Sequence, residues 1–246
     1  MIEFGRSDPD WQSIHIFEGY LTMNLFKSTV GRKILMAVTG LCLVGFISVH
    51  LLGNLSVFAG PDGINAYAEH LHSLGPLVWI FRLIMLGLFA VHITFGVQLY
   101  LENRAATPDN YAVQKTLVTT FSAKTMVFTG LIILAFLLYH LLHFTVQITN
   151  PATSAHHLPL DMANRLDVFT MVTASFQNAF IALVYIVAMI ALTLHIFHGL
   201  SSWVQTFGWS TGASQDKVTF IGKLVAIAYG LAYIAIPLLL LARIVK

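Results

Sequence analysis

The chain has 246 residues, of which 57% are hydrophobic and only 10% are charged, and its formal net charge is +2. So few polar residues could not cover a surface that faces water on all sides, which excludes an ordinary soluble protein and indicates a membrane protein. We therefore expect a lipid bilayer around the chain and no nucleic-acid partner.

Five apolar runs, taken in chain order, are each long enough to cross about 30 Å of hydrocarbon as a helix. They cover residues 34–58, 77–101, 126–148, 176–203 and 220–244, and short connections join them. The sequence predicts an all-α integral membrane bundle of five transmembrane helices that forms one domain over residues 1–246. Residues 1–33 are polar and of mixed charge, so we expect them to form a cytoplasmic N-terminal arm.

The basic residues predict the orientation of the bundle. Nine of the 13 Lys and Arg residues lie on the side of the N-terminus and four lie on the opposite side. By the positive-inside rule, the N-terminus faces the cytoplasm and the C-terminus faces out. Residues 61–76 then lie outside, and their apolar side chains recur at helical spacing, which predicts a short amphipathic helix on the outer membrane face. The single cysteine, Cys42, excludes an internal disulfide and argues against an iron–sulfur cluster on this chain.

The first and third apolar runs share a repeated pattern. Gly40 precedes His50 by ten positions, and Gly130 precedes His140 by the same ten, with a threonine before each glycine. The second and fourth runs share a different pattern, in which a histidine is followed four residues later by a glycine. These histidines are His92 and His195, so the chain reads as a two-helix unit used twice.

The four histidines pair by their predicted depth in the membrane. At about 1.5 Å per residue, His50 and His140 lie roughly 26 Å and 24 Å above the inner edge, whereas His92 and His195 lie roughly 12–20 Å above it. An intramembrane histidine indicates function by default, because an unsatisfied imidazole in hydrocarbon is costly. Two facing pairs are what two bis-histidine b haems require, since each haem iron takes one nitrogen from either side of the ring.

Several other residues are candidates for a haem environment. A macrocycle between helices needs close backbone clearance, which favours glycine near the ligands. Arg82 lies ten residues outward of His92 and is a candidate partner for a haem propionate, with snorkelling to the interface as the alternative. His143 and His198 each follow a proposed ligand by three residues and could assist the haem or replace that ligand. The clearance glycines are Gly40, Gly130, Gly96 and Gly199.

At this point the chain resembles a known family, the five-helix, dihaem cytochrome b membrane-anchor subunits of succinate:quinone oxidoreductases, which include fumarate reductases. The resemblance runs from about residue 27 to residue 210 and rests on five motifs. These are Gly31-Arg32-Lys33, the segment from His50 to Asn54, His92 before Asn103-Arg104, Thr129-Gly130 with His140, and His195 with Gly199 and Gly208-Trp209.

The resemblance implies that His50 and His140 ligate a distal haem near the outer face, and that His92 and His195 ligate a proximal haem near hydrophilic partners. An FAD flavoprotein subunit would oxidise succinate and an iron–sulfur subunit would relay electrons. This chain would pass them through both haems to menaquinone or another quinone, or in reverse to reduce fumarate. It would thus be a non-flavin subunit of respiratory complex II, which links the tricarboxylic acid cycle to electron transport, in the bacterial cytoplasmic (inner) membrane.

One residue departs from the family pattern. Some fumarate-reducing members carry a glutamate two residues before the fourth-helix ligand, where it helps to move protons across the membrane. This chain has Thr193 at that position, which argues against the same proton path.

A quinone site needs hydrogen-bond donors and a proton carrier close to a haem edge. Near the outer haem the sequence offers four polar candidates, and an inner-face site that uses Lys33 or Arg104 is an alternative. The four outer candidates are Asn54, Tyr67, Glu69 and His70.

Three other functions compete with this interpretation. The haem b subunits of formate dehydrogenases, hydrogenases and nitrate reductases tend to place two ligands on one helix, whereas this chain has one histidine on each of four runs. A haem-free, proton-coupled transporter would be expected to carry carboxylates in the middle of a span, and here Glu102 lies only at an edge. The third possibility is a purely structural anchor without a cofactor.

Overall fold

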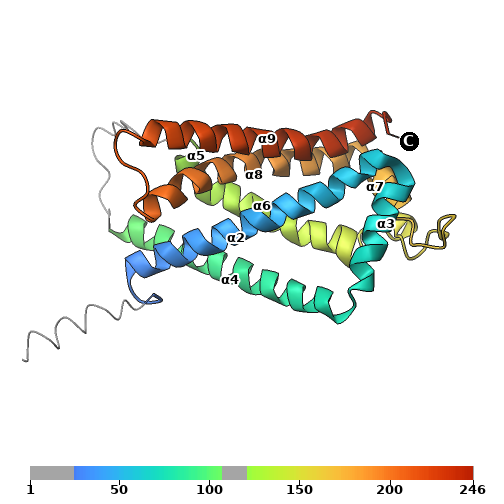
Figure 1. The fold of residues 1–246 in the computed structure, drawn as a ribbon, viewed down its shortest axis with the longest axis horizontal. Helices are drawn as coiled ribbons and strands as arrows, with labels where there is room; N and C mark the ends of the chain where they lie inside the picture. The colour runs from blue at the N-terminus through green and yellow to red at the C-terminus, as the bar shows by residue number, and fades with distance from the viewer. Residues whose placement is uncertain (1–24, 107–120, 246) are drawn as a thin grey trace, which may run out of the picture.

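The computed structural model describes residues 25–106 and 121–245. Within these ranges the chain is helical and contains no strand, and five helices are long and apolar enough to cross a membrane. Figure 1 shows them running roughly along one common direction, which confirms the predicted all-α membrane bundle. The five helices are α2 (Thr29–Leu55), α4 (Pro76–Ala105), α6 (Met126–His140), α8 (Ala179–Thr206) and α9 (Gln215–Leu241).

The helix ends differ from the predicted spans where side chains cap the backbone. The helix α2 begins five residues before the predicted start, because the Ser28 hydroxyl accepts a hydrogen bond from the Gly31 amide at 3.0 Å. The predicted fourth span starts in a separate helix, α7 (Val168–Phe176), and α8 begins only after Asn178. The Asn178 side chain accepts from the amides of Phe180 and Ile181, so one apolar run contains a helix end and a new helix start.

Between α2 and α4 the chain forms a 3-10 turn, η1 (Ser56–Ala59), and then the short helix α3 (Gly60–Ser73). This confirms the helix predicted between the first two spans. The remaining short elements are α5 (Phe121–Lys124), the π-helix η2 (Leu141–Thr145) directly after α6, and the 3-10 turn η3 (Pro151–Thr153).

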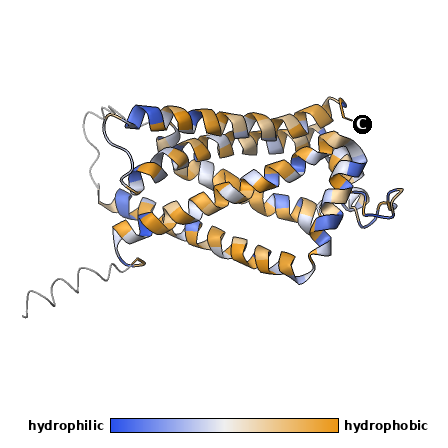
Figure 2. Ribbon diagram, viewed as in Figure 1, coloured by the Kyte–Doolittle hydropathy of each residue, from blue (hydrophilic) through white to orange (hydrophobic). Residues whose placement is uncertain are grey.

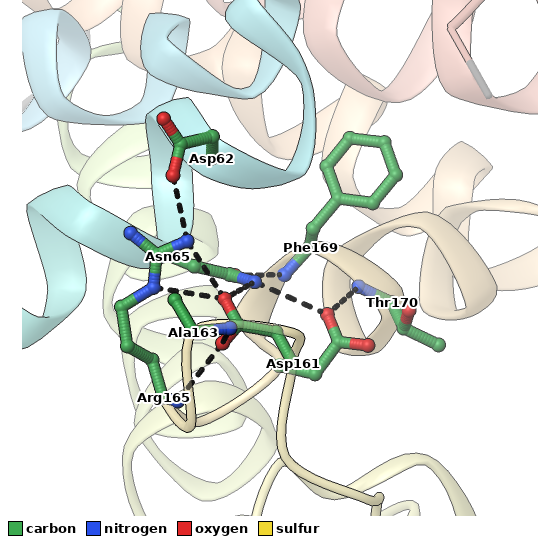
Figure 3. A network of polar contacts seen from close by, with 8 residues as sticks. Asp62, Asn65, Asp161, Ala163, Arg165, Phe169 and Thr170 are labelled. Atoms are coloured by element: carbon green, nitrogen blue, oxygen red, sulfur yellow. Dashed lines mark hydrogen bonds and ion pairs between the residues drawn. The ribbon is translucent and has the colours of Figure 1, made fainter.

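A polar network holds α3 against the loop before α7 (Figure 3). Asn65 is buried, and its side-chain oxygen accepts from the amide of Phe169 at 2.9 Å while its amide group donates to Asp161 at 3.1 Å. Arg165 bridges the carboxylates of Asp161 and Asp62 at 2.8 Å and 2.7 Å. The network therefore fixes the end of the bundle that carries α3 and α7.

The middle of the five long helices is mostly hydrophobic, whereas hydrophilic residues are concentrated toward the two ends of the bundle (Figure 2). The helix α8 packs against α9, α6 and α2, and α4 packs mainly against α2. In the most apolar 18-residue window of α8, 39% of the residues are buried, compared with 6% in that of α4. The exposed α4 residues Phe81, Leu83, Ile84 and Leu86 are spread over more than half of the helix circumference at about 100° per residue, so lipid on one face does not account for them all.

Candidate functional site

Four histidines from four different helices lie in two pairs between the helices. His50 on α2 and His140 on α6 have ring centroids 5.8 Å apart, with the ring planes at 88°. His92 on α4 and His195 on α8 have ring centroids 6.3 Å apart, with the planes at 66°. These are the two pairs that the depth of each histidine predicts from the sequence.

The spacing of the rings is that of two imidazoles on one metal ion. A metal bound to one nitrogen of each ring at about 2.0 Å would hold the two ring centres about 6 Å apart. Two bare aromatic rings also pack at about 4.5–7 Å, so the distance alone does not separate the two arrangements. The hydrogen bonds of the ring nitrogens distinguish a pair of metal ligands from two packed rings.

The inner pair consists of His92 and His195, and the partner of His92 identifies its protonated nitrogen. The Nδ1 atom of His92 lies 3.3 Å from Thr39 Oγ1 on α2. The Thr39 hydroxyl already donates its hydrogen to the carbonyl of Leu35 at 2.8 Å, so it acts as the acceptor for His92. The Nδ1 atom of His92 therefore carries the hydrogen, and its Nε2 atom carries a lone pair.

The second half of the repeat builds the same arrangement around His195. Its Nδ1 atom lies 3.3 Å from Thr129 Oγ1 on α6, and the Thr129 hydroxyl donates to the Met126 carbonyl at 2.9 Å. The threonine of each repeated motif thus orients a histidine on the following long helix, a contact that the sequence pattern alone did not reveal.

The inner pair consequently presents two Nε2 lone pairs and no hydrogen for a bond between the rings. Among the hydrogen bonds of the described residues, none joins His92 to His195. Two acceptors in an apolar bundle are unfavourable unless a donor or a Lewis acid binds both of them, and a metal ion is a Lewis acid that two imidazoles can ligate. The arrangement is that of two metal ligands, each oriented by a hydrogen bond on its other ring nitrogen.

The glycines of the repeat lie against the inner pair. A Cβ atom on Gly40 would come within 3.1 Å of His92 Cε1, and one on Gly130 would come within 3.4 Å of His195 Cε1. The two glycines therefore make room for the imidazole rings themselves. Gly96 faces the Met36 sulfur instead, and a Cβ on Gly199 would meet nothing within 4 Å.

The outer pair consists of His50 and His140, and its surroundings differ on the two sides. His50 stacks on Phe46 of its own helix, with ring centroids 5.5 Å apart. His140 Nδ1 lies 3.3 Å from the hydroxyl of Tyr185 on α8. Sequence analysis did not single out Tyr185, although a tyrosine in the middle of an apolar span is a signal that its hydroxyl has a partner.

His143, the alternative ligand three residues after His140, is buried and has partners on both ring nitrogens. Its Nδ1 atom lies 3.0 Å from the Tyr185 hydroxyl, and its Nε2 atom lies 3.2 Å from Ser175 Oγ. These contacts fit a residue that supports His140 through Tyr185. His198, the corresponding residue after His195, is partly buried on α8.

The five remaining candidates have different surroundings. Arg82 is exposed, and its guanidinium lies over the ring of Trp79, 4.8 Å from the centroid. The Asn54 side chain donates to the backbone carbonyl of His50 at 2.7 Å. Tyr67 packs its ring against Gly53, whereas Glu69 and His70 are exposed on α3.

Within residues 25–106 and 121–245, two buried nitrogen donors at the opposite end of the bundle have no hydrogen-bond partner. They are Arg32 Nε at the start of α2 and Trp203 Nε1 near the end of α8. The other guanidinium nitrogens of Arg32 bind Glu102 on α4, one of them at 2.8 Å. Buried unsatisfied donors are rare in native structures, and haem propionates are acceptors that would satisfy them.

A bare metal ion would need more ligands than a histidine pair supplies. No group of three or more His, Cys, Asp or Glu side chains that could hold a metal ion occurs in residues 25–106 and 121–245. A haem supplies four ring nitrogens of its own, so two histidines complete its coordination. The residues present therefore fit a haem better than a free ion.

Comparison of the chain with family models, with curated proteins and with solved structures finds no match in any of the three.

Proposed function

We propose that this chain is the dihaem cytochrome b membrane anchor of a succinate:quinone oxidoreductase. It would carry electrons from a partner iron–sulfur subunit, through two bis-histidine b haems, to a membrane quinone, with menaquinone as the expected type. The observation that carries the haem assignment is the inner pair. Both of its histidines donate from Nδ1 to the preceding helix and keep Nε2 for a ligand between them.

Each histidine pair lies at its own level of the bundle. On α2, Gly40 marks the level of His92, and His50 follows ten residues later, which is about 15 Å along the helix. The two sites therefore lie one beyond the other along the bundle axis, as a relay across a bilayer requires. When bound, haem supplies the one-electron chemistry that no side chain of this chain can supply.

The residues around the histidines bind, orient and shield the cofactors. Thr39 and Thr129 hold the inner imidazoles in the ligating tautomer, and Tyr185 is placed to do the same for His140. A hydrogen bond donated from Nδ1 makes Nε2 more basic and therefore a stronger electron donor to a bound iron. This would favour the oxidised state of that iron. Aromatic rings around His140 keep water from the outer pair, including that of Phe136 at 5.7 Å.

The succinate assignment rests on the sequence resemblance, and one structural feature supports haem over proton transport. Glu102, the carboxylate at the edge of a span, is bound to Arg32 at the end of α4 rather than placed among the histidines. The placement of one histidine on each of four helices also favours this family over the haem b subunits of formate dehydrogenases, hydrogenases and nitrate reductases.

The decisive experiment purifies the native complex through a tag on this chain and measures its haem. We expect two b-type haems per chain by the pyridine haemochrome assay and a reduced-minus-oxidised spectrum that develops on addition of succinate. One haem per chain would contradict the four-ligand arrangement. Two haems that succinate leaves oxidised, while formate, hydrogen or another donor reduces them, would place the chain in a different oxidoreductase.

A further inference from the structure

A cavity of about 290 Å³ lies where the loop after α6 meets the end of α7 and the start of α8. Its lining is mixed: Asn150, Ser175 and Asn178 are polar, and Ala174 and Ile181 are apolar. Small-molecule sites usually begin at about 300 Å³ and combine an apolar wall with a few polar groups. The volume suits a one- or two-ring headgroup, and the open side leaves space for a tail.

A chain of hydrogen bonds connects this cavity to His140 of the outer pair. His140 Nδ1 lies 3.3 Å from the Tyr185 hydroxyl, which lies 3.0 Å from His143 Nδ1. His143 Nε2 in turn lies 3.2 Å from Ser175 Oγ and 3.1 Å from the side-chain nitrogen of Asn150. Ser175 and Asn150 both line the cavity, so only two side chains separate its wall from a proposed haem ligand.

The backbone has an unusual conformation directly after His140. Directly after His140 the chain continues as the π-helix η2, a rare conformation that often marks functional sites. This turn lets His140 and His143, three residues apart, both reach the same Tyr185 hydroxyl. The loop then bends at Gln147, which has a φ of 60°, and brings Asn150 back to His143.

Ligation of His140 would set the donor and the acceptor in every hydrogen bond of this series of side chains. If Nε2 binds iron, Nδ1 carries a hydrogen and donates to Tyr185, and Tyr185 donates to His143 Nδ1. His143 then donates from Nε2, and Ser175 can accept because its own hydrogen goes to the Met171 carbonyl at 2.7 Å. A half-turn of the Asn150 amide, whose nitrogen faces His143 in the structure, would let its oxygen accept from this donor and would leave its nitrogen to donate to a ligand in the cavity that Asn150 lines.

We propose that this cavity binds the headgroup of the membrane quinone, with Asn150 as a donor to one quinone carbonyl and His143 as the residue that positions Asn150 and Ser175. The proposal rests on the proposed function, because the electrons must come from a reduced partner through the outer histidine pair. The apolar wall of Ala174 and Ile181 would contact the ring face.

Reduction of a quinone in this site needs a source of electrons and a source of protons. One quinone takes up two electrons and two protons, both carbonyl oxygens become hydroxyls, and no group leaves. The electrons arrive one at a time from the reduced iron–sulfur subunit. The protons come from water at the open side of the cavity.

This location differs from the one that the sequence suggests on α3. Among the α3 candidates, Glu69 and His70 are exposed, and no hydrogen bond of the described residues links their side chains to His50 or His140. The cavity has such a link, through Ser175 and Asn150. An alternative occupant with similar polar chemistry is a phospholipid headgroup, which the experiment separates from a quinone.

The test uses the whole complex purified through this chain, in lipid nanodiscs. A photoreactive azidonaphthoquinone is crosslinked and the labelled peptide is identified by mass spectrometry. We expect the label within residues 149–181 and its loss when menadione, a naphthoquinone without a long tail, is added. Labelling of α3, or labelling that anionic phospholipid blocks and menadione does not, would overturn the proposal.

Kinetics provide the second measurement, with matched variants. Ala174→Leu fills the cavity and Asn150→Ala removes the donor. We expect each to raise the menadione concentration for half-maximal haem reoxidation by roughly fivefold to tenfold, the size of one lost hydrogen bond or contact. The α3 variants Glu69→Gln and His70→Asn are the controls and should leave it unchanged. The reverse pattern would overturn the proposal. Haem spectra confirm that each variant is folded.

The positioning role of His143 has its own readout. His143→Phe keeps a ring but loses both hydrogen bonds, and we expect a higher KM for menadione with little change in the maximal rate. His143→Gln keeps an amide that can donate toward Ser175 and should recover part of the affinity. Equal loss in both variants, or a change in the maximal rate alone, would contradict this role.

The two proposals can fail separately. A complex without haem that still takes the photolabel in residues 149–181 would contradict the proposed electron transfer and leave the quinone site standing. A complex with two haems and the label on α3 would do the opposite.

Discussion

At the scale of single residues, two threonine hydroxyls decide what the inner histidines can do. The hydroxyl groups of Thr39 and Thr129 donate hydrogen bonds to backbone carbonyls, so they can only accept hydrogen bonds from the imidazoles. His92 and His195 are therefore held as donors on Nδ1 and as potential ligands on Nε2. The chemistry of the site depends on which ring nitrogen carries the hydrogen, and a neighbouring helix controls that choice.

The two histidine pairs should behave independently. Replacing His50 or His140 with alanine should remove one haem and leave the other, and replacing His92 or His195 should remove the other haem. The reason is that each iron loses one of its two protein ligands while the second site keeps both. Haem content per chain and low-temperature optical spectra measure this. Loss of both haems from a single substitution would argue against separate sites.

Gly40 should be far less tolerant of a side chain than its neighbour Gly45. A methyl group on Gly40 would lie 3.1 Å from His92 Cε1, which is tighter than ordinary contact, whereas one on Gly45 would meet nothing within 4 Å. We expect Gly40→Ala to shift the ring and weaken haem retention at the inner site by about 10–100-fold, the usual effect of disturbing a ligand's support. Gly45→Ala is the control, and equal haem loss in both variants would contradict the prediction.

At the scale of elements, a polar network holds the short helix α3 and the loop before α7 together. The pKa of Asp161 is lowered to about 2. The largest cause is the hydrogen bond from the backbone amide of Arg165, and hydrogen bonds from the side chains of Asn65 and Arg165 add to it. A carboxyl group with a lower pKa in the folded state stabilises that state only while it is ionised. Its contribution is complete above the ordinary pKa of 3.8 and disappears as the pH falls toward 2.

Acid should therefore open this loop locally. Between about pH 4 and pH 2, the protection of the amides of residues 161–170 against hydrogen exchange, corrected for the pH dependence of the intrinsic exchange rate, should fall before the protection of the long helices does. Asp161→Asn should produce the faster exchange already at neutral pH, because Arg165 loses one of its two carboxylate partners. The exposed Asp216 at the start of α9 supplies the control Asp216→Asn. Unchanged exchange in Asp161→Asn would contradict the role of this network.

At the scale of the whole molecule, the bundle has two distinct ends. One end carries α3, α7 and their polar network, and the other carries Arg32, Glu102 and the unsatisfied Trp203 nitrogen. The histidine pairs lie between these ends at different levels. The distribution of basic residues predicts that the end with α3 faces away from the cytoplasm.

Cysteine labelling tests this orientation directly. In a Cys42→Ala background, a membrane-impermeant maleimide added to intact spheroplasts should label Glu69→Cys on α3 and leave Lys217→Cys on α9 unlabelled. Both residues are exposed, so access from the chosen side is the variable. After permeabilisation both should react. Labelling of Lys217→Cys in intact spheroplasts would reverse the orientation.

The sequence by itself determined the five spans, the helix between the first two, and which histidines can meet. Run length, helical spacing and the repeated motif are local properties, and each follows from the rise and period of an α-helix. Tyr185 shows where that reasoning ends, since a residue's position along a helix does not show what lies across from it.

Only the tertiary structure decided how the helices face one another. The contacts of Thr39 with His92, of Thr129 with His195 and of Tyr185 with both His140 and His143 join different helices. The break between α7 and α8 inside one apolar run is likewise set by the Asn178 cap. Such contacts depend on how each helix is rotated about its axis and on which helices lie beside it. Helix packing determines both, and the pattern of hydrophobic residues along the chain does not predict them.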